Sequence, residues 1–239
     1  MQLVVDIETT STADHIWCAV TEDVETGEVL CHTNPHTLEY LIKKYDTVVG
    51  HNLIGFDIPV LKRLWNVGIE QHQISDTLIL SRLLNPVLEG GHSLKAWGQR
   101  LGDHKIDFTD YDGGLSDEMI DYCKQDVHLT VRLYKHLLNE LGKWKDASQS
   151  IQIETNIAHI CKKQEENGFL LDVPAASLLD AQLRDRMGVI EDELQTVFPP
   201  IVEERWSEKT NKQLKDKVTV FNVGSRKQIA DRLTTLGWK

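Results

Sequence analysis

Residues 3–8 read Leu-Val-Val-Asp-Ile-Glu, an apolar run that is interrupted by Asp6 and closed by Glu8. Such a run is typical of a buried strand, and alternate side chains along a strand point to the same face. Asp6 and Glu8 therefore share one face of the predicted strand. Two carboxylates together on a core strand repel each other and lose hydration unless cations neutralise them. The pair alone favours a metal site only weakly, because a strand that ends in water also carries acids.

Outward from this strand, the sequence predicts further strands and then an alternation of strands and helices. Glu25-Thr26-Gly27 is a hairpin signal, and Ser116 is expected to cap a long helix whose apolar residues recur at helical spacing. This order favours a mixed α/β sheet covered by helices. The expected strands are 16–24, 28–32, 47–50 and 74–77, and the expected helices are 37–45, 58–65, 78–84, 93–101 and 116–141.

The polar segment 142–150 lacks periodicity and predicts a domain boundary, with one domain over 1–145 and a second over 151–239. The second domain is expected to be a small helical extension, and its second helix is expected to be capped by Asp172. Its expected helices are 153–167, the segment from Asp172 to Pro199, and 225–236, with a charged, irregular stretch over 201–218.

Composition narrows the possible functions. The 239 residues are 41% hydrophobic and 26% charged, which suits one large or two modest folded domains. The net charge is −11, which disfavours a free-standing duplex binder held by phosphate contacts. Four scattered cysteines argue against a zinc site or a disulfide framework. No stretch reaches the roughly 18 apolar residues of a membrane span, and no secretory signal is seen, so a cytoplasmic protein is expected.

Two later motifs add carboxylates to the first pair. Asn52 follows the strand 47–50 and Asp57 opens the next helix, which gives the pattern N-x-x-x-x-D. Tyr122 and Asp126 are four residues apart and so lie on one face of the long helix. Asp126 falls within apolar periodicity and is expected to be partly buried.

In order, D-x-E, N-x-x-x-x-D and Y-x-x-x-D resemble the DEDD superfamily of 3′–5′ exonucleases. The histidine branch carries His where this chain has Asp121, so the resemblance is to the tyrosine branch. Segments 75–83 and 93–102 look like the proofreading domain of family A DNA polymerases from short-tailed bacteriophages. Segments 163–169 and 221–226 look like the opening of the polymerase domain that follows it.

This resemblance covers nearly the whole chain and implies a ribonuclease H-like fold. The fingers helix and palm aspartates of a polymerase are missing from these 239 residues, so no polymerase activity is expected of them.

The resemblance also implies two divalent cations, Mg²⁺ or Mn²⁺, held by Asp6, Glu8, Asp57 and Asp126. Oxygen ligands suit these ions better than zinc, and two ions roughly 3.5–4 Å apart clamp a scissile phosphate. Asp6, Glu8 and Asp126 would hold the water-activating ion, while Asp6 bridges to the second ion and Asp57 acts through its water shell. Tyr122 would orient the attacking water, because a phenol of pKa about 10 is a poor base.

Three residues are predicted to contact the substrate. Thr9 is expected to offer its backbone N–H to the terminal nucleotide, and Asn52 to bond a phosphate oxygen or the sugar. Phe56 is expected either to stack on a base or to pack in the core. His51 is interpreted as a capping or core histidine.

Two other patterns suggest alternative sites. The segment 110–114 hints at a calcium loop but is interpreted as a turn. Lys209, Lys212, Lys215 and Lys217 are interpreted as a solvated loop rather than DNA contacts.

The leading hypothesis is a metal-dependent 3′–5′ exonuclease that releases 5′-mononucleotides from single-stranded DNA 3′ ends. Its partner would be a family A polymerase domain, in cis or as a separate chain, and a phage-encoded chain would act in the host cytoplasm. An exoribonuclease of the same branch and a catalytically silent module that anchors a polymerase are alternatives. The polymerase-like C-terminal stretch argues against the first, and the retained carboxylates and tyrosine argue against the second.

Overall fold

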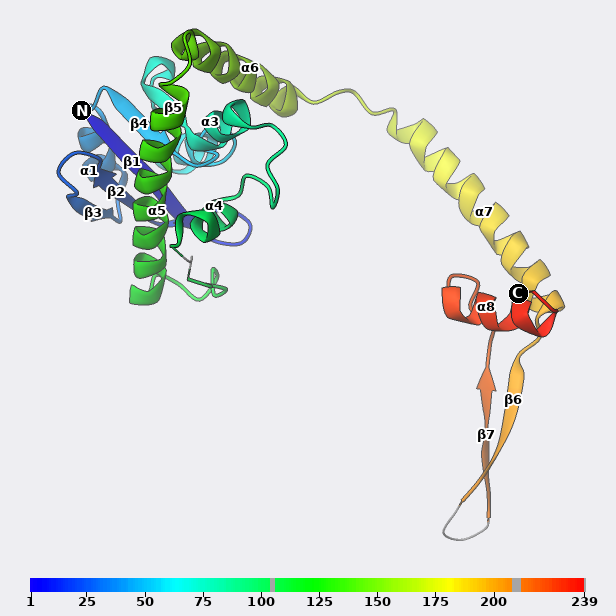
Figure 1. The fold of residues 1–239 in the computed structure, drawn as a ribbon. Coiled ribbons are helices and arrows are strands. Elements are labelled where there is room, and N and C mark those ends of the chain that lie inside the picture. The colour runs from blue at the N-terminus through cyan, green and yellow to red at the C-terminus, as the bar shows by residue number, and fades with distance from the viewer. Residues whose placement is uncertain (104–105, 208–211, 239) are drawn as a thin grey trace. The chain divides into compact units, whose positions relative to one another are not determined.

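The computed structural model describes residues 1–103, 106–207 and 212–238, and the chain divides into two units, Met1–Gly168 and Phe169–Lys239 (Figure 1). Helix α6 (Ala147–Asn167) belongs to the first unit, where it packs against α3 (Thr77–Leu84). The division therefore differs from the boundary expected at 142–150. The polar segment there separates two helices, but the second helix still packs on the first unit.

The first unit is built on a five-stranded mixed sheet of order β3-β2-β1-β4-β5. The central strand β1 pairs antiparallel with β2 and parallel with β4, and β5 continues the parallel side. The carboxyl ends of β1, β4 and β5 therefore lie at the same edge of the sheet. The strands are β1 (Gln2–Thr9), β2 (Ile16–Asp23), β3 (Val29–His32), β4 (Thr47–Gly50) and β5 (Ile74–Asp76), close to the expected ranges.

Most helices of this unit also begin and end near the predicted residues. Ser116 caps the long helix as expected, since its hydroxyl accepts from the backbone N–H of Met119 at 3.1 Å. The helix expected over 58–65 is instead a single α-helical turn followed by the wider π-helical turn η1. Asn66, at φ 54°, closes that wider turn. The helices are α1 (Pro35–Ile42), α2 (Asp57–Val60), η1 (Leu61–Trp65), η2 (Gln71–Gln73), α3, α4 (Leu94–Leu101), α5 (Asp117–Leu141) and α6.

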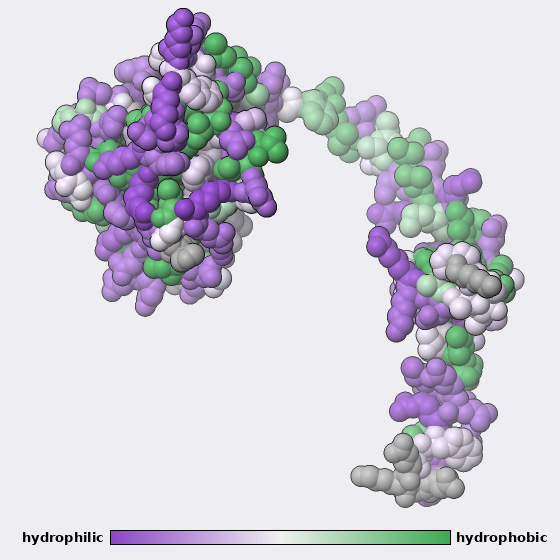
Figure 2. All heavy atoms as spheres, viewed as in Figure 1, coloured by the Kyte–Doolittle hydropathy of each residue, from purple (hydrophilic) through white to green (hydrophobic). Residues whose placement is uncertain are grey.

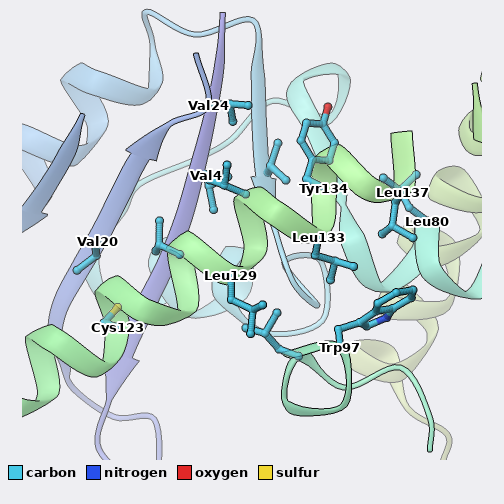
Figure 3. Close-up of a cluster of buried hydrophobic side chains, with 14 of the residues drawn as sticks. Val4, Val20, Val24, Leu80, Trp97, Cys123, Leu129, Leu133, Tyr134 and Leu137 are labelled. Carbon is cyan, nitrogen blue, oxygen red and sulfur yellow. The ribbon is translucent and has the colours of Figure 1, made fainter. Parts of the chain in front are cut away.

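Buried apolar clusters cover both faces of the sheet. Val4 packs in the cluster that contains α5, whereas Leu3 and Val5 pack in the cluster that contains α1 and η1. Figure 3 shows α5 beside β1, with Leu129 and Leu133 buried in the first of these clusters. Side chains alternate along a strand, so Asp6 and Glu8 share the face of Val4 and are directed toward α5.

The second unit contains α7 (Val173–Val197), β6 (Ile201–Trp206), β7 (Gln213–Thr219) and α8 (Arg226–Thr235). Asp172 caps α7 as predicted, because its carboxylate accepts from the N–H of Ala175 at 3.0 Å. Figure 2 shows apolar side chains on the surface of this unit, and the exposed ones on α7 include Leu179, Leu183 and Met187.

The prediction of an irregular stretch over 201–218 is wrong, because β6 and β7 form an antiparallel hairpin. A two-stranded ribbon buries neither face, so its sequence lacks the alternation that marks a half-buried strand. Lys217 pairs with Glu203 across the ribbon at 3.1 Å, and Lys212 and Lys215 are exposed. Lys209 lies outside the described residues.

None of the helices in the described part of the chain combines the length and the apolar character needed to cross a lipid bilayer.

Candidate active site

The four predicted carboxylates come from three segments that meet at the carboxyl edge of the sheet. Asp6 and Glu8 leave β1 toward α5, Asp57 opens α2 just beyond β4, and Asp126 lies on α5. Glu8, Asp57 and Asp126 expose only 5%, 3% and 4% of their surface. Three of the four acids are therefore almost fully withdrawn from water, where ionised carboxylates are costly.

The charge of one of these acids acts on another. Burial, and then the charge of Asp6, raise the pKa of Asp57 well above its usual range. The oxygens of Asp6 and Glu8 and the sulfur of Cys123 all lie within 4.8 Å of one another. A divalent cation would relieve the repulsion in such a cluster, and carboxylate oxygens are ligands that Mg²⁺ and Mn²⁺ accept. The donor set therefore fits a divalent cation.

Cys123 was not predicted as part of this site. Its thiol lies 3.5 Å from Oδ2 of Asp6 and 3.7 Å from the backbone oxygen of the same residue. Burial is the main cause that raises the pKa of this thiol. Cys123 therefore acts as a weak S–H donor that fixes Asp6. The sequence showed it only as a member of the apolar stripe of the long helix.

Tyr122 lies beside the carboxylates and is 7% exposed. Burial, the hydrogen bond with Tyr111 and the charges of Asp126 and Glu8 all raise its pKa. The phenol is therefore protonated at any working pH. This favours a role in which Tyr122 orients a water molecule, since it cannot serve as a base while protonated.

Tyr111, which the sequence placed only in a turn, supports Tyr122. Its hydroxyl donates to the hydroxyl of Tyr122 at 3.5 Å, and the ring of Phe108 packs against both tyrosines. The indole N–H of Trp17 donates to the backbone oxygen of Tyr111 at 2.8 Å. The side chain of Asp112 accepts from both the N–H and the hydroxyl of Ser11. These contacts hold the turn 110–114 against the connection between β1 and β2.

A cleft of about 370 Å³ opens beside Glu8 and is also lined by Thr9, Phe56 and Tyr111. It thus contains two of the three predicted substrate contacts. Phe56 is 39% exposed, so core packing does not account for its ring. Asn52 does not line this cleft and instead lines two others.

Asp76 was not predicted as a site residue, and it holds the segment 52–57 in place. Its carboxylate accepts backbone N–H groups of Asn52 at 2.9 Å, Ile54 at 3.1 Å and Leu78 at 2.9 Å, and Asp76 is 3% exposed. Asn52 adopts a left-handed conformation with φ 63°. Asp76 therefore caps α3 and also fixes the loop that delivers Asp57. The sequence signal for this capping role was the position of Asp76 just before the helix expected over 78–84.

We expect Asp76→Asn to lower stability by about 1–3 kcal/mol, because an amide in place of the carboxylate leaves a buried N–H without an acceptor. Catalysis should also weaken as the loop that carries Asp57 relaxes. Urea unfolding and nuclease rates measure the two effects. Asp172→Asn is the matched control, since Asn replaces Asp well at a simple N-cap. If both variants behaved like the parent, Asp76 would have no positioning role.

A model of a family described as 3′–5′ exonuclease matches residues 4–142, more than half of the chain. A DNA-directed DNA polymerase of Enterobacteria phage T3 is 26% identical over 260 residues, which cover 82% of this chain and 37% of the relative. The chain thus spans little more than a third of that relative's length.

Two solved structures share the fold. NrnC of Brucella melitensis bound to pGG has a TM-score of 0.56 at 18% identity and covers 72% of this chain and 88% of its own. The POL domain of Pol1 from M. smegmatis has a TM-score of 0.62 at 13% identity, with 96% and 36% covered. With the five-stranded mixed sheet, these similarities confirm the ribonuclease H-like class expected for the first unit.

Proposed function

This chain belongs to the 3′–5′ exonuclease family whose model spans residues 4–142, and on that premise we propose that it removes nucleotides from DNA 3′ ends by metal-dependent hydrolysis. The observation that supports the proposal is the cluster of Asp6 and Glu8, whose ligand atoms lie within 4.8 Å of each other, with the charge of Asp6 acting on the buried Asp57 and the charges of Glu8 and Asp126 both acting on Tyr122. DNA is the proposed substrate because the phage T3 relative is a DNA-directed DNA polymerase.

We assign Asp6, Glu8, Asp57 and Asp126 as the residues that would hold two divalent cations, Mg²⁺ or Mn²⁺. When bound, such ions activate water and stabilise the leaving 3′ oxygen. The closeness of Asp6 to Glu8 and the effect of Asp6 on the pKa of Asp57 support Asp6 as the shared ligand.

The other residues of the site position the reacting groups. The protonated hydroxyl of Tyr122 would orient the attacking water, and Tyr111 would steady that hydroxyl. The terminal nucleotide would occupy the cleft of about 370 Å³, with its base against Phe56 and the backbone N–H of Thr9 within reach. Asn52 would contact the next part of the strand.

The experiment is digestion of a 5′-labelled single-stranded oligonucleotide with Mg²⁺ or Mn²⁺, followed by sizing of the products. The expected result is a ladder that shortens one nucleotide at a time and that a chelator prevents. A matched RNA strand tests the exoribonuclease alternative. Faster digestion of RNA would reverse the substrate assignment, and no digestion of either strand would revive a non-catalytic anchor.

Single-stranded 3′ ends should be degraded faster than paired ends. Terminal nucleotides must leave the duplex to enter the cleft, and unstacking a base costs a few kcal/mol. The net charge of −11 offers little electrostatic gain to offset that cost. Initial rates on a single strand and on the same strand in a blunt duplex, at one salt concentration, measure the difference. Equal rates would contradict the expectation.

For the second unit, we propose that residues 169–239 are the opening of a family A polymerase domain, linked in cis or completed by a separate chain. The similarity to Pol1, which extends over 96% of this chain, and the match to part of a longer phage polymerase support this reading.

A further inference from the structure

We propose that Arg82 binds the phosphate backbone of the DNA strand on the 5′ side of the terminal nucleotide, in a second cleft that is lined by Asn52, at the start of the segment leading to Asp57. This inference rests on the proposed nuclease function and extends it by naming a backbone-binding residue outside the acidic centre.

The second cleft differs from the acidic centre in its charge. Its volume is about 470 Å³, and its lining combines imidazole, amide and guanidinium groups with apolar side chains. Among the described residues no carboxylate lines it, although the chain as a whole has a net charge of −11. A polyanionic strand would therefore meet no carboxylate in the lining of this cleft. The cleft is lined by His51, Asn52, Leu78, Arg82, His92, Ser93 and Leu94.

The chain segment 52–57 connects this cleft to the predicted position of the terminal nucleotide. Asn52, at one end of the segment, lines the second cleft, and Phe56 lines the cleft beside Glu8. Asp57, a proposed metal ligand, follows directly. A strand whose terminal base lies against Phe56 can therefore continue past Asn52 toward Arg82.

Among the described residues of the first unit, Arg82 is the arginine whose guanidinium makes no hydrogen bond or ion pair. Its side chain is exposed. By contrast, Arg63 and Arg100 donate to backbone carbonyls, and Arg132 pairs with Asp103 at 2.6 Å. A guanidinium presents a planar set of donors that matches phosphate oxygens in pairs.

The walls around Arg82 are fixed by hydrogen bonds. Asp76 caps the first turn of α3, the helix that carries Arg82. The hydroxyl of Ser81 bonds both Nδ1 of His92 at 2.7 Å and the indole N–H of Trp97 at 2.9 Å. Arg82 also lines an adjoining cleft of about 160 Å³, together with Asp76 and with Lys162 and Glu165 of α6, which form an ion pair at 3.9 Å. The surroundings of the Arg82 guanidinium are thus positioned before the strand binds.

The test compares Arg82→Ala and Arg82→Lys with the parent on two substrates. One is a single-stranded DNA oligonucleotide, and the other is a mononucleotide phosphodiester with a chromogenic leaving group, which has no phosphate on the 5′ side. Lys135→Ala is the matched control, because Lys135 is an exposed cation on α5 with no ion pair among the described residues.

For Arg82→Ala, KM on the oligonucleotide should rise about ten- to a hundred-fold, as expected for the loss of a charge-assisted contact, with kcat nearly unchanged. The slope of log KM against log salt should fall by about 0.7, the value for one phosphate contact on a single strand. Arg82→Lys should restore the slope and part of the affinity. The mononucleotide substrate should be cleaved at the parental rate by all variants.

If the KM and salt slope of Arg82→Ala matched those of Lys135→Ala while the parent cleaved both substrates, the inference alone would be overturned. Loss of activity on the mononucleotide substrate would also overturn it, because Arg82 would then act at the reacting phosphate. A parent that cleaved neither substrate would overturn the proposed function itself.

Discussion

Asp6→Ala should abolish cleavage and leave the metal-free chain at least as stable as the parent. A carboxylate oxygen of Asp6 lies within 4.8 Å of one of Glu8, and the charge of Asp6 raises the pKa of the buried Asp57. Asp6 is therefore the carboxylate best placed to bind both proposed cations. Its removal takes away a metal ligand and also relieves repulsion among buried acids. Rates on a labelled oligonucleotide at saturating Mn²⁺ and urea midpoints in chelator measure the two effects.

The combination of lost activity and retained stability distinguishes a metal ligand from a structural acid. Asp180→Ala is a suitable control, since Asp180 is an exposed acid on α7 that pairs with Arg184 at 2.8 Å. The control should match the parent in rate. Retention by Asp6→Ala of more than about a tenth of the parental rate, a loss of less than 1.4 kcal/mol, would contradict the assignment.

Tyr122→Phe should lower the rate roughly ten- to a thousand-fold, because a positioning hydrogen bond is worth a few kcal/mol in the transition state. The metal affinity should be unchanged, since the phenol is not a proposed ligand. The pH dependence of the rate should also be unchanged, because the pKa of Tyr122 is raised and the hydroxyl does not ionise. Rates at saturating Mn²⁺, a Mn²⁺ titration and a pH profile test these three statements.

Asp126→Asn provides the contrast, because it removes a charged ligand from the same face of α5 and should weaken metal binding as well as the rate. Tyr45→Phe is the matched control, since the hydroxyl of Tyr45 donates to Asp23 at 2.7 Å and takes no part in the site. If Tyr122→Phe were as inactive as Asp6→Ala, the tyrosine would do more than orient water. A fully active Tyr122→Phe would remove the tyrosine from the mechanism.

The parts of the fold that could be predicted from the sequence are those with local signals. Strand β4 and the capped start of α5 were predicted to the residue, because apolar runs and a Ser-Asp-Glu cap depend only on neighbours in the chain. The β6–β7 hairpin was not predicted, since an exposed ribbon needs no apolar alternation.

For the candidate site, the motifs identified residues that the fold brings together, but not the residues that hold them. The hydrogen bonds of Asp76 to Asn52 and Ile54 join segments 24 and 22 residues apart. The contact of Tyr111 with Tyr122 depends on a turn held by Trp17 and Asp112. Such roles arise from tertiary structure, which no short pattern in one sequence encodes.

The long helix α5 carries both site residues and core residues, and this has a consequence for thermal unfolding. Its first half carries Tyr122 and Asp126, while its second half contributes Leu133, Leu137 and Leu141 to the core. Local opening is confined to regions with few buried contacts, and α5 is not such a region. Tyr122 and Asp126 should therefore keep their positions until the core itself unfolds, so that heating displaces these two site residues and melts the core in one transition.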